Sequence, residues 1–560
     1  MDVEGAGSRN LRFISTVTVA MMTLTGFSIE SSFAASTCED LDDFSLPDAK
    51  ITLARSYLSG HTVFGLTKAP VDICRIAVTV KPSLDSDIKF EIWIPINGSW
   101  NGSFEQIGNG GFAGTIWTSY LANAVSRGYA AAATDDGTSG PPRGAAAFLG
   151  HPDIQLDYGY RAIKVTTDNS KLLIKRLTGG SPRYSYFSGC SDGGREALME
   201  AQRYPADFDG IIVGSPSNDM VGLLGASFPW NMQALLSGPK TDGVPDAYIP
   251  ASKLNLLSGA ALSQCAGTDG GLPTDPYLNN PRACHFRAEI AGCETGKDPL
   301  TCLTPAQVEA ANKLYRGSHD SGGELLFPGY EPGSESNAAN WPEWLVGTSS
   351  ASPGIQSALA AGFWCDQIIQ KKDCKLGNVI ERFAGAVREV APIVNATDPD
   401  LQRFERRGGK LIQYAGWADT AIAPENGINY YRKVMSVMGD VRDFYRVFMA
   451  PGMAHCYGGA GPNSFGNGIS DGPVIDADHD LLKALERWVE HGIAPVEIIA
   501  TKYIDDNPEH GVAFQRPLCA YPKIARYDRH GNSTDASSFE CTTDQSDAAS
   551  EARALQHAYK

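Results

Sequence analysis

Apolar residues in the first part of the chain fall into short runs that are typical of strands. Alternating and β-branched residues predict strands at 77–80 and 88–94, and a short apolar run predicts a buried strand at 129–133. Further strands are predicted at 184–188 and 209–214. Helical patterns separate the later strands, and this alternation predicts a parallel sheet covered by helices.

The helical patterns cover 158–177 and 194–204. The same rhythm returns later, with strands predicted at 409–415 and 443–449 on either side of a helix at 426–438. A last amphipathic helix places these apolar residues on one face: Leu481, Leu482, Leu485, Trp488 and Val489.

The middle of the chain lacks this rhythm. Residues 217–396 are rich in Gly, Pro and Ser and contain their own group of cysteines: Cys265, Cys284, Cys293, Cys302, Cys365 and Cys374. We therefore predict an inserted lid domain over 217–396, stapled by disulfides, which interrupts a core formed by 35–216 and 397–560.

The composition is that of a soluble globular protein, with 42% hydrophobic and 20% charged residues among 560. The formal net charge of -17 argues against nucleic acid as a partner, because phosphate binding needs concentrated Lys and Arg. An apolar run at 13–27, followed by small residues at Ser32 and Ala34, predicts a cleavable signal peptide over 1–34. An uncleaved interfacial anchor is the alternative. The run is short for a bilayer, so no stable membrane insertion is expected.

The twelve cysteines form an even set, which in an exported chain indicates disulfides. No Cys-x-x-Cys pair occurs, which disfavours a zinc knuckle or ribbon. The protein is therefore expected outside the reducing cytosol, either secreted or periplasmic. The spacing of the cysteines leaves their connectivity open.

A Gly-x-Ser-x-Gly motif occurs as Gly189, Ser191 and Gly193, between a predicted strand and a predicted helix. The strand must turn sharply into the helix, and a side chain at either glycine would collide with its neighbours. The bend presents the Ser191 hydroxyl beside the helix N-terminus, which favours developing negative charge. The alternative is an ordinary Gly-rich turn.

A serine nucleophile needs a base and an orienting acid. Among ten histidines, His455 lies in a Gly-rich loop directly after the strand predicted at 443–449. Asp419 follows the strand predicted at 409–415 and lies between Ser191 and His455 in the chain, the order typical of α/β-hydrolases. We predict a triad of Ser191, His455 and Asp419; a satisfied loop histidine and a surface aspartate are the alternatives.

Two cysteines flank the predicted catalytic pair. Cys190 precedes Ser191, and Cys456 follows His455. A bond between the two cysteines would close a very long loop and contribute roughly 5 kcal/mol in the chain-entropy account. It would also fix the nucleophile relative to the base, whereas the alternative is that both thiols pair elsewhere.

Two backbone N–H groups should stabilise the oxyanion of the tetrahedral intermediate. We expect one from Asp192, directly after the nucleophile. The other is expected from the Gly-rich loop at 107–114, with Gly108 as the donor because a residue without Cβ allows close approach. A phosphate-binding loop is the rival use, but the Lys and Ser/Thr of a P-loop are absent.

Together these features predict an α/β-hydrolase core with a large inserted lid, and they resemble the tannase and feruloyl esterase family. The resemblance runs from about Cys38 to Cys541 and rests on the following residues: Cys190–Ser191, His455–Cys456, 100–102, 108–114, 193–195 and 516–522. It implies hydrolysis of small aromatic carboxylic esters, such as feruloyl or galloyl esters, through an acyl-enzyme.

The resemblance also implies a set of disulfides: Cys38–Cys74, Cys190–Cys456, Cys265–Cys284, Cys293–Cys302, Cys365–Cys374 and Cys519–Cys541. Family members usually carry an Asp-rich calcium loop, which corresponds here to 265–284. Asp269 and Asp275 remain in it, but Ala266 and Pro273 stand where the family has carboxylates. Because calcium needs six or more oxygen ligands, a structural calcium ion is disfavoured, and no cofactor is expected to be required.

Two rival functions remain open. One relative in the family hydrolyses mono(2-hydroxyethyl) terephthalate, whose free carboxylate should face an Arg of the lid. Residues 341–364, where that Arg is expected, contain neither Arg nor Lys. The second rival is a catalytically inactive binding protein on the same scaffold, and the complete set of Ser191, Asp419 and His455 argues against it.

Overall fold

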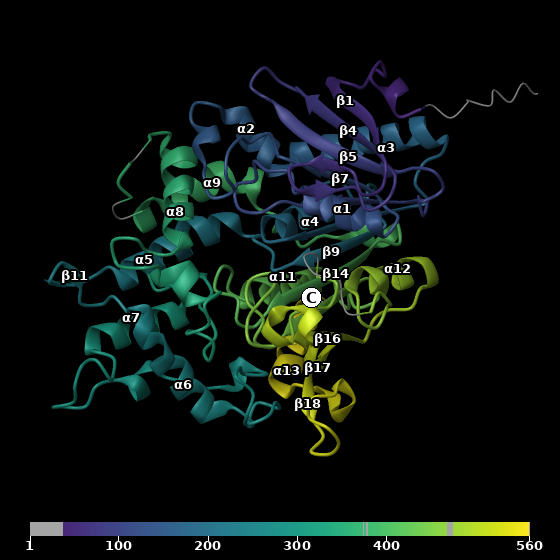
Figure 1. Cartoon of the computed structure of the whole chain (residues 1–560). Coiled ribbons are helices and arrows are strands. Elements are labelled where there is room, and N and C mark those ends of the chain that lie inside the picture. Colours follow the sequence, from purple (N-terminus) through teal and green to yellow (C-terminus); the bar gives the residue numbers. More distant parts are fainter. Residues whose placement is uncertain (1–36, 373, 377–378, 468–473, 559–560) are drawn as a thin grey trace, which may run out of the picture.

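The computed structural model describes residues 37–372, 374–376, 379–467 and 474–558, and the signal peptide predicted over 1–34 lies outside this part. A nine-stranded mixed sheet runs through the molecule in the order β1-β4-β5-β7-β6-β8-β9-β14-β15 (Figure 1). Its strands are β1 (Ala49–Tyr57), β4 (Ile73–Val80), β5 (Ile88–Pro95), β6 (Ser103–Ile107), β7 (Ala130–Thr134), β8 (Tyr184–Cys190), β9 (Gly210–Gly214), β14 (Lys410–Gly416) and β15 (Tyr445–Ala450).

The sheet has an antiparallel part and a parallel part. Strands β1, β4, β5 and β7 pair antiparallel, whereas β7, β6, β8, β9, β14 and β15 pair parallel. Every residue of β7 and β9 is buried, as expected for parallel strands covered on both faces. The fold is that of an α/β-hydrolase.

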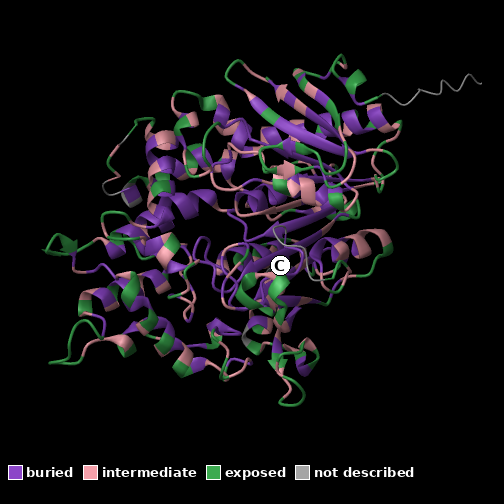
Figure 2. Ribbon diagram, in the orientation of Figure 1, coloured by how far each residue is buried: buried purple, intermediate pink, exposed green. Residues whose placement is uncertain are grey.

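Helices cover both faces of the sheet. Apolar side chains of α3 (Ala162–Thr178), α4 (Asp192–Arg203) and α11 (Glu425–Met438) belong to the core on one face. Those of α1 (Thr118–Ser126) and α12 (Leu481–His491) belong to the core on the other face. The predicted amphipathic helix is α12, whose Leu481, Leu485 and Trp488 are buried. Figure 2 shows the resulting band of buried residues along the sheet.

Residues 217–396 form a helical segment beside the sheet, coloured teal to green in Figure 1. Its α-helices are α5 (Phe228–Leu235), α6 (Leu254–Cys265), α7 (Pro305–Arg316), α8 (Ile355–Ala361) and α9 (Phe383–Val394), with π-helical turns at Val221–Ser227, Pro342–Val346 and Gly362–Ile369. The segment has its own core, which includes Trp341, Phe363 and Trp364. Phe112 and Tyr158 from the sheet side join this core, so the segment packs directly onto the rest of the molecule.

The remaining elements are short or lie near the C-terminus. Two hairpins and a helix follow α12: β16 (Glu497–Tyr503) with β17 (Val512–Cys519), β18 (Lys523–Tyr527) with β19 (Phe539–Thr543), and α13 (Gln545–Ala558). The other strands and α-helices are β2 (Thr62–Phe64), β3 (Thr67–Lys68), β10 (Lys240–Thr241), β11 (Val244–Pro245), β12 (Ser318–His319), β13 (Leu325–Phe327), α2 (Pro152–Leu156) and α10 (Gln402–Arg406).

All twelve cysteines are paired in disulfides, and the pairs are the ones that the family resemblance implies. Three of the bonds, Cys265–Cys284, Cys293–Cys302 and Cys365–Cys374, lie within the helical segment. Within the described ranges, no helix combines the length and apolar character that crossing a membrane would require.

Candidate active site

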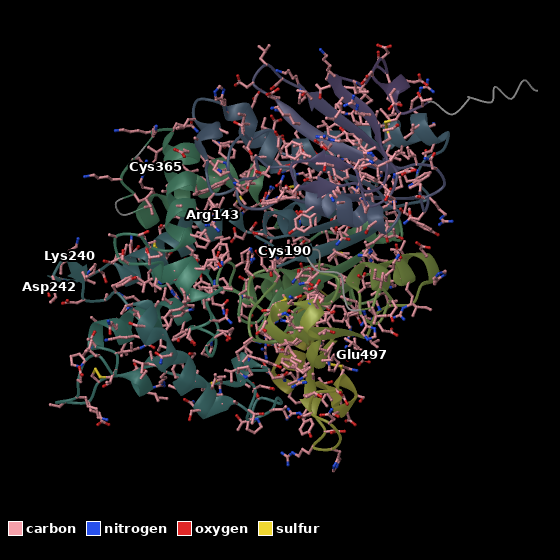
Figure 3. The ribbon with its side chains drawn as sticks, in the orientation of Figure 1. Arg143, Cys190, Lys240, Asp242, Cys365 and Glu497 are labelled. Carbon is pink, nitrogen blue, oxygen red and sulfur yellow. A yellow bond between two sulfur atoms is a disulfide. The ribbon has the colours of Figure 1, made fainter. Side chains whose placement is uncertain are left out.

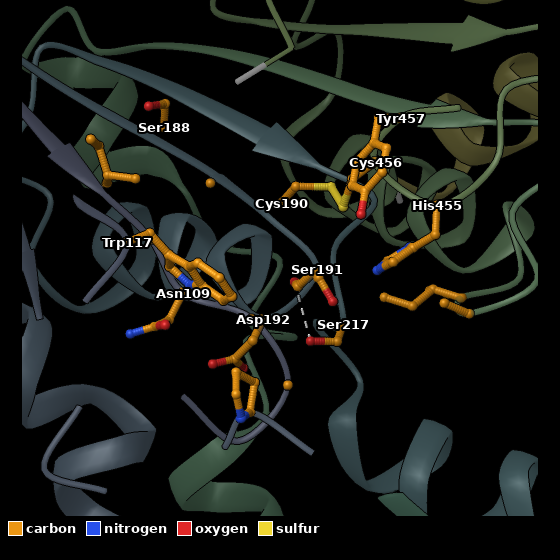
Figure 4. A pocket seen from close by; sticks show the side chains of 18 of the residues that line it. Asn109, Trp117, Ser188, Cys190, Ser191, Asp192, Ser217, His455, Cys456 and Tyr457 are labelled. Atoms are coloured by element: carbon orange, nitrogen blue, oxygen red, sulfur yellow. Dashed lines mark hydrogen bonds between the residues drawn. A yellow bond between two sulfur atoms is a disulfide. The ribbon is translucent and has the colours of Figure 1, made fainter. Parts of the chain in front are cut away.

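Ser191 lies at the tip of a sharp turn between β8 and α4. Its backbone, at φ 67° and ψ −120°, adopts a conformation that is costly for a residue with a side chain and typical of a nucleophile elbow. A Cβ at Gly189 would lie 2.5 Å from the backbone of Gly193, and one at Gly193 would lie 2.8 Å from the Asn109 carbonyl oxygen. The turn is fixed further by the Ser217 hydroxyl, which donates to the Ser191 carbonyl at 3.2 Å (Figure 4).

The half-buried His455 and the buried Asp419 form a pair on two loops that follow the neighbouring parallel strands β15 and β14. His455 Nδ1 lies 2.9 Å from Asp419 Oδ2, and Asp419 is 2% exposed. The other oxygen, Oδ1, accepts the backbone N–H groups of Ala421 and Ile422, each at 2.9 Å. These bonds fix the carboxylate, and the carboxylate in turn leaves the second imidazole nitrogen of His455 available for another partner.

Ser191 and His455 line the same cavity. In Figure 4 the His455 ring extends toward the Ser191 side chain. A disulfide joins Cys190 to Cys456, which are 266 residues apart, and so connects the two loops that carry the serine and the histidine. On its other side, the His455 ring contacts Trp344 edge-to-face, with ring centroids 5.2 Å apart.

The oxyanion donors differ in part from those predicted. Gly108 was expected to donate, but its N–H is already bonded to the Ser188 carbonyl at 2.9 Å as part of the sheet, so this prediction is wrong. The N–H of Asn109 is also hydrogen-bonded, since it donates to Glu196 Oε2 at 2.9 Å. Gly110 is the next residue of the loop and lines the cavity, with open space where its side chain would be.

Asp192 keeps its predicted position after the nucleophile. No hydrogen bond recorded among the described residues uses the N–H of Asp192 or of Gly110. Both residues line the cavity beside Ser191. Both N–H groups are therefore available to a developing oxyanion.

The cavity has a volume of about 370 Å³ and is mainly apolar. This volume is in the range of small-molecule sites. The helical segment contributes much of the wall, through Leu223, Leu224, Phe228, Trp344, Ile355 and Leu359. Trp117 and Tyr120 form another part of the wall, at and beyond the start of α1. An aromatic ring would therefore be enclosed by apolar side chains next to Ser191.

Arg143 also lines the cavity and was not predicted from the sequence. Its side chain is 63% exposed and lies 3.6 Å from the carboxylate of Glu343. Figure 3 shows Arg143 between the helical segment and the sheet. A cation was expected only within 341–364, whereas Arg143 comes from a Pro-Pro-Arg-Gly turn ahead of the helical segment. No motif in the sequence links that turn to the cavity.

The loop at 265–284 does not fit a tightly bound calcium ion. Asp269 Oδ2 accepts the backbone N–H of Asn279 at 2.5 Å, and Asp275 Oδ2 accepts that of Leu272 at 3.0 Å. Arg516 donates to Asp275 Oδ1 at 3.3 Å, so a buried cation already accompanies this carboxylate. Two carboxylates that accept N–H donors fall short of the six or more oxygens that calcium requires.

Sequence comparison connects this site to known proteins. The profile of the Tannase and feruloyl esterase family matches residues 74–542. The chain is 36% identical over 550 residues to an uncharacterized esterase of Xanthomonas campestris pv. campestris, with 92% of this chain and 93% of that protein covered. It is 32% identical over 471 residues to a probable feruloyl esterase B-2 of Aspergillus flavus, with 82% and 86% covered.

Solved structures agree with the sequence matches. Feruloyl esterase B from Aspergillus oryzae superimposes with a TM-score of 0.81 at 27% identity, covering 90% of this chain and 99% of that one. Tannin acyl hydrolase from Aspergillus niger gives a TM-score of 0.71 at 21% identity, covering 91% and 94%, which is a likeness of fold. The chain therefore belongs to the tannase and feruloyl esterase family of carboxylic ester hydrolases.

Proposed function

We propose that the chain is a secreted serine esterase that hydrolyses small aromatic carboxylic esters, such as feruloyl or galloyl esters, through an acyl-enzyme. One observation carries the proposal. Ser191 sits on a strained turn in the same apolar cavity as His455, which is held by a buried carboxylate.

In the proposed mechanism, Ser191 Oγ attacks the ester carbonyl carbon and His455 accepts its proton. Asp419 holds the imidazole in the required tautomer and stabilises the imidazolium that forms. The N–H groups of Asp192 and Gly110 receive the oxyanion. His455 then gives its proton to the leaving alcohol oxygen, which breaks the ester bond and leaves the acid on Ser191. Water activated by His455 releases the acid and restores the serine.

The proposed acid component is aromatic because the cavity offers an apolar enclosure for a flat ring. We assign residues 217–396 as the lid and 35–216 with 397–560 as the catalytic core, since the helical segment supplies much of the cavity wall. The six disulfides favour a secreted or periplasmic protein. The proposed partners are small-molecule aromatic esters, and the net charge of -17 disfavours nucleic acid.

Arg143 supports a second candidate, an esterase of the kind that hydrolyses mono(2-hydroxyethyl) terephthalate. A guanidinium group at the cavity wall suits a substrate with a free carboxylate. The Glu343 carboxylate 3.6 Å away competes for the same cation, so feruloyl and galloyl esters remain the first choice.

A hydrolysis panel tests both candidates. We expect the protein to hydrolyse methyl ferulate or methyl gallate with a higher kcat/KM than mono(2-hydroxyethyl) terephthalate, and Ser191→Ala to lose turnover of all three. Fastest hydrolysis of the terephthalate ester would favour the second candidate. Equal, background turnover by wild type and Ser191→Ala would instead indicate a binding protein on a hydrolase scaffold.

A further inference from the structure

Three carboxyl groups are buried together directly behind the proposed oxyanion site. Asp136 follows β7, whereas Asp192 and Glu196 lie one turn apart on α4. Each of the three offers an oxygen within 4.8 Å of the others, and they are only 0%, 1% and 0% exposed, respectively. Such a concentration of negative charge in the interior requires compensation.

The negative charge of Asp192 is balanced by a neighbouring cation. Arg195 Nε donates to Asp192 Oδ1 at 2.5 Å, and Tyr158 Oη lies 3.0 Å from the same oxygen. The remaining guanidinium nitrogens of Arg195 donate to the carbonyls of Tyr158 and Gly159 at 2.9 and 2.7 Å. One cation therefore balances one of the three carboxylates, and Asp136 and Glu196 remain.

Glu196 directly contacts the Gly-rich loop at 107–114, here called the oxyanion loop. Its Oε2 accepts the backbone N–H of Asn109 at 2.9 Å, and the Asn109 carbonyl accepts the N–H of Gly193 at 2.8 Å. A Cβ at Gly108 would lie 2.8 Å from the same Glu196 oxygen. The position of the Glu196 carboxylate therefore sets the path of the loop immediately before Gly110.

Asp136 faces Glu196 without another donor. Within the described ranges, no backbone N–H, hydroxyl or basic side chain donates a hydrogen bond to either oxygen of Asp136 or to Oε1 of Glu196. Two adjacent buried carboxylates do not both ionise, so they hold a proton between them. Burial raises the pKa of Asp136 well above its ordinary value and that of Glu196 to about 7, and the neighbouring Asp192 charge raises both further. Asp136 is then the neutral donor and Glu196 the acceptor.

A divalent cation is the other way to balance this charge, and the ligands present disfavour it. A calcium or magnesium ion takes six or more oxygens, many of them from water. Here Glu196 and Asp192 already accept hydrogen bonds from Asn109, Tyr158 and Arg195, and all three carboxyl groups are sealed from solvent.

We propose that Asp136 and Glu196 are a proton-sharing pair that positions the oxyanion loop. Protonated Asp136 donates to the Glu196 carboxylate, whose Oε2 accepts the Asn109 N–H and so directs the Gly110 N–H toward the substrate carbonyl. Neither residue touches the substrate, and both are therefore positioning residues. This inference rests on the proposed function, since it assigns a role within the same oxyanion site.

The test compares two replacements of Glu196 with a matched control. Glu196→Met keeps side-chain volume but removes the acceptor, whereas Glu196→Gln keeps an oxygen for Asn109 and offers an amide N–H to Asp136. Glu200→Met is the control, because Glu200 lies one turn further along α4, is 0% exposed and has no hydrogen-bond partner among the described residues. Hydrolysis of methyl ferulate is measured for each, together with inhibition by an aryl boronic acid and by the free product acid.

We expect Glu196→Met to lower kcat by about 10- to 100-fold with KM within about twofold, because a displaced oxyanion donor affects the transition state. Boronic acid inhibition, which forms a tetrahedral adduct, should weaken by a similar factor while product binding is unchanged. Glu196→Gln should recover most of the lost kcat, and Glu200→Met should match wild type. Equal kcat for Glu196→Met and Glu200→Met, or no recovery in Glu196→Gln, would overturn the proposal.

Two further variants keep the test decisive. Should Glu196→Met fail to fold, Asp136→Gly removes the proton donor at a position whose φ of 56° suits glycine, and Asp136→Asn restores a donor. A lower kcat in the first that is recovered in the second supports the pair, and equal kcat in both contradicts it. Ser191→Ala is assayed in parallel, because turnover by that variant would refute the proposed function itself and not only the role of Asp136 and Glu196.

Discussion

The Asp419 carboxylate is held by two backbone N–H groups and contacts His455, so its proposed role is to orient the imidazole. Asp419→Asn keeps the shape but presents an amide that favours the wrong imidazole tautomer. We expect kcat for methyl ferulate to fall by about 10³- to 10⁴-fold, with KM changed little. Steady-state kinetics check this, with the exposed Asp443→Asn as control. A loss of less than tenfold would remove Asp419 from the triad.

Arg143 is the residue whose effect should depend on the substrate. Arg143→Ala should lower kcat/KM about fivefold for mono(2-hydroxyethyl) terephthalate, the size of a partly exposed ion pair, and leave neutral methyl ferulate unchanged. Lys240→Ala is the control, because Lys240 is an exposed cation on β10 that does not line the cavity (Figure 3). An equal decrease for both esters would show that Arg143 only supports the loop.

Among the structural elements, the disulfide between the serine and histidine loops should contribute most to stability and to activity. Its closed loop of 266 residues predicts a loss of about 5 kcal/mol in Cys190→Ala/Cys456→Ala, against about 3 kcal/mol for the nine-residue Cys365–Cys374 loop. Thermal melting measures both. Activity should fall further in the first pair variant than in the second, because only the first releases His455 relative to Ser191. Equal activity losses would contradict this role.

The loop at 265–284 gives a prediction about metal. Since Arg516 and backbone N–H groups already satisfy Asp269 and Asp275, calcium should not raise the melting temperature and EDTA should not lower it. Differential scanning calorimetry with about 5 mM calcium, and separately with about 5 mM EDTA, measures the two melting temperatures. About this concentration is enough to saturate weak calcium sites. A rise of several degrees with calcium would show that the loop rearranges to bind the ion.

Strands β7, β8, β9, β14 and β15 were predictable from sequence because apolar residues make up much of each. The central strand β6 was missed, because its buried residues include the polar Glu105 and Gln106. β1 was missed, since this edge strand buries only Ile51 and Ala54 and exposes Lys50 and Arg55. The hairpins β16–β17 and β18–β19 were missed too, and no strand was predicted there. An exposed strand, like a buried strand that carries polar residues, lacks the apolar run that makes a strand visible in a sequence.

The candidate site was predictable where a motif fixes the local geometry. The Ser191 turn and the adjacent cysteines are examples, because each depends on neighbours in the chain. The prediction of Gly108 as an oxyanion donor was wrong, because a sequence does not show which N–H groups are already hydrogen-bonded along the sheet. Arg143, Asp136 and Glu196 were missed because residues distant in the chain meet there only after folding.

For the whole molecule, buried carboxyl groups link stability to pH. Burial raises the pKa of Asp135 to about 6 and those of Glu196, Glu331, Glu486 and Glu551 to about 7. The folded state therefore holds protons that the unfolded chain releases near pH 3.8 for Asp135 and near pH 4.5 for the glutamates, so these groups stabilise the fold at low pH. Their contribution is lost as pH rises toward and through 7.

Glu551 on α13 allows a direct check. It is 5% exposed, and its Oε1 has no hydrogen-bond partner among the described residues. Glu551→Gln should raise the free energy of unfolding by about 1–3 kcal/mol at pH 8 and leave it nearly unchanged at about pH 4, where Glu551 is protonated in the folded state and largely so in the unfolded chain. Denaturant unfolding at the two pH values measures the difference. Equal effects at both would mean that Glu551 is charged throughout this range.

The account as a whole depends on Ser191 being a nucleophile activated by His455. The most direct measurement is reaction with a fluorophosphonate followed by peptide mass spectrometry. We predict one label per chain, located on Ser191, with no label in Ser191→Ala and much slower labelling in His455→Ala. Labelling of another residue, or equal labelling of wild type and Ser191→Ala, would contradict the account.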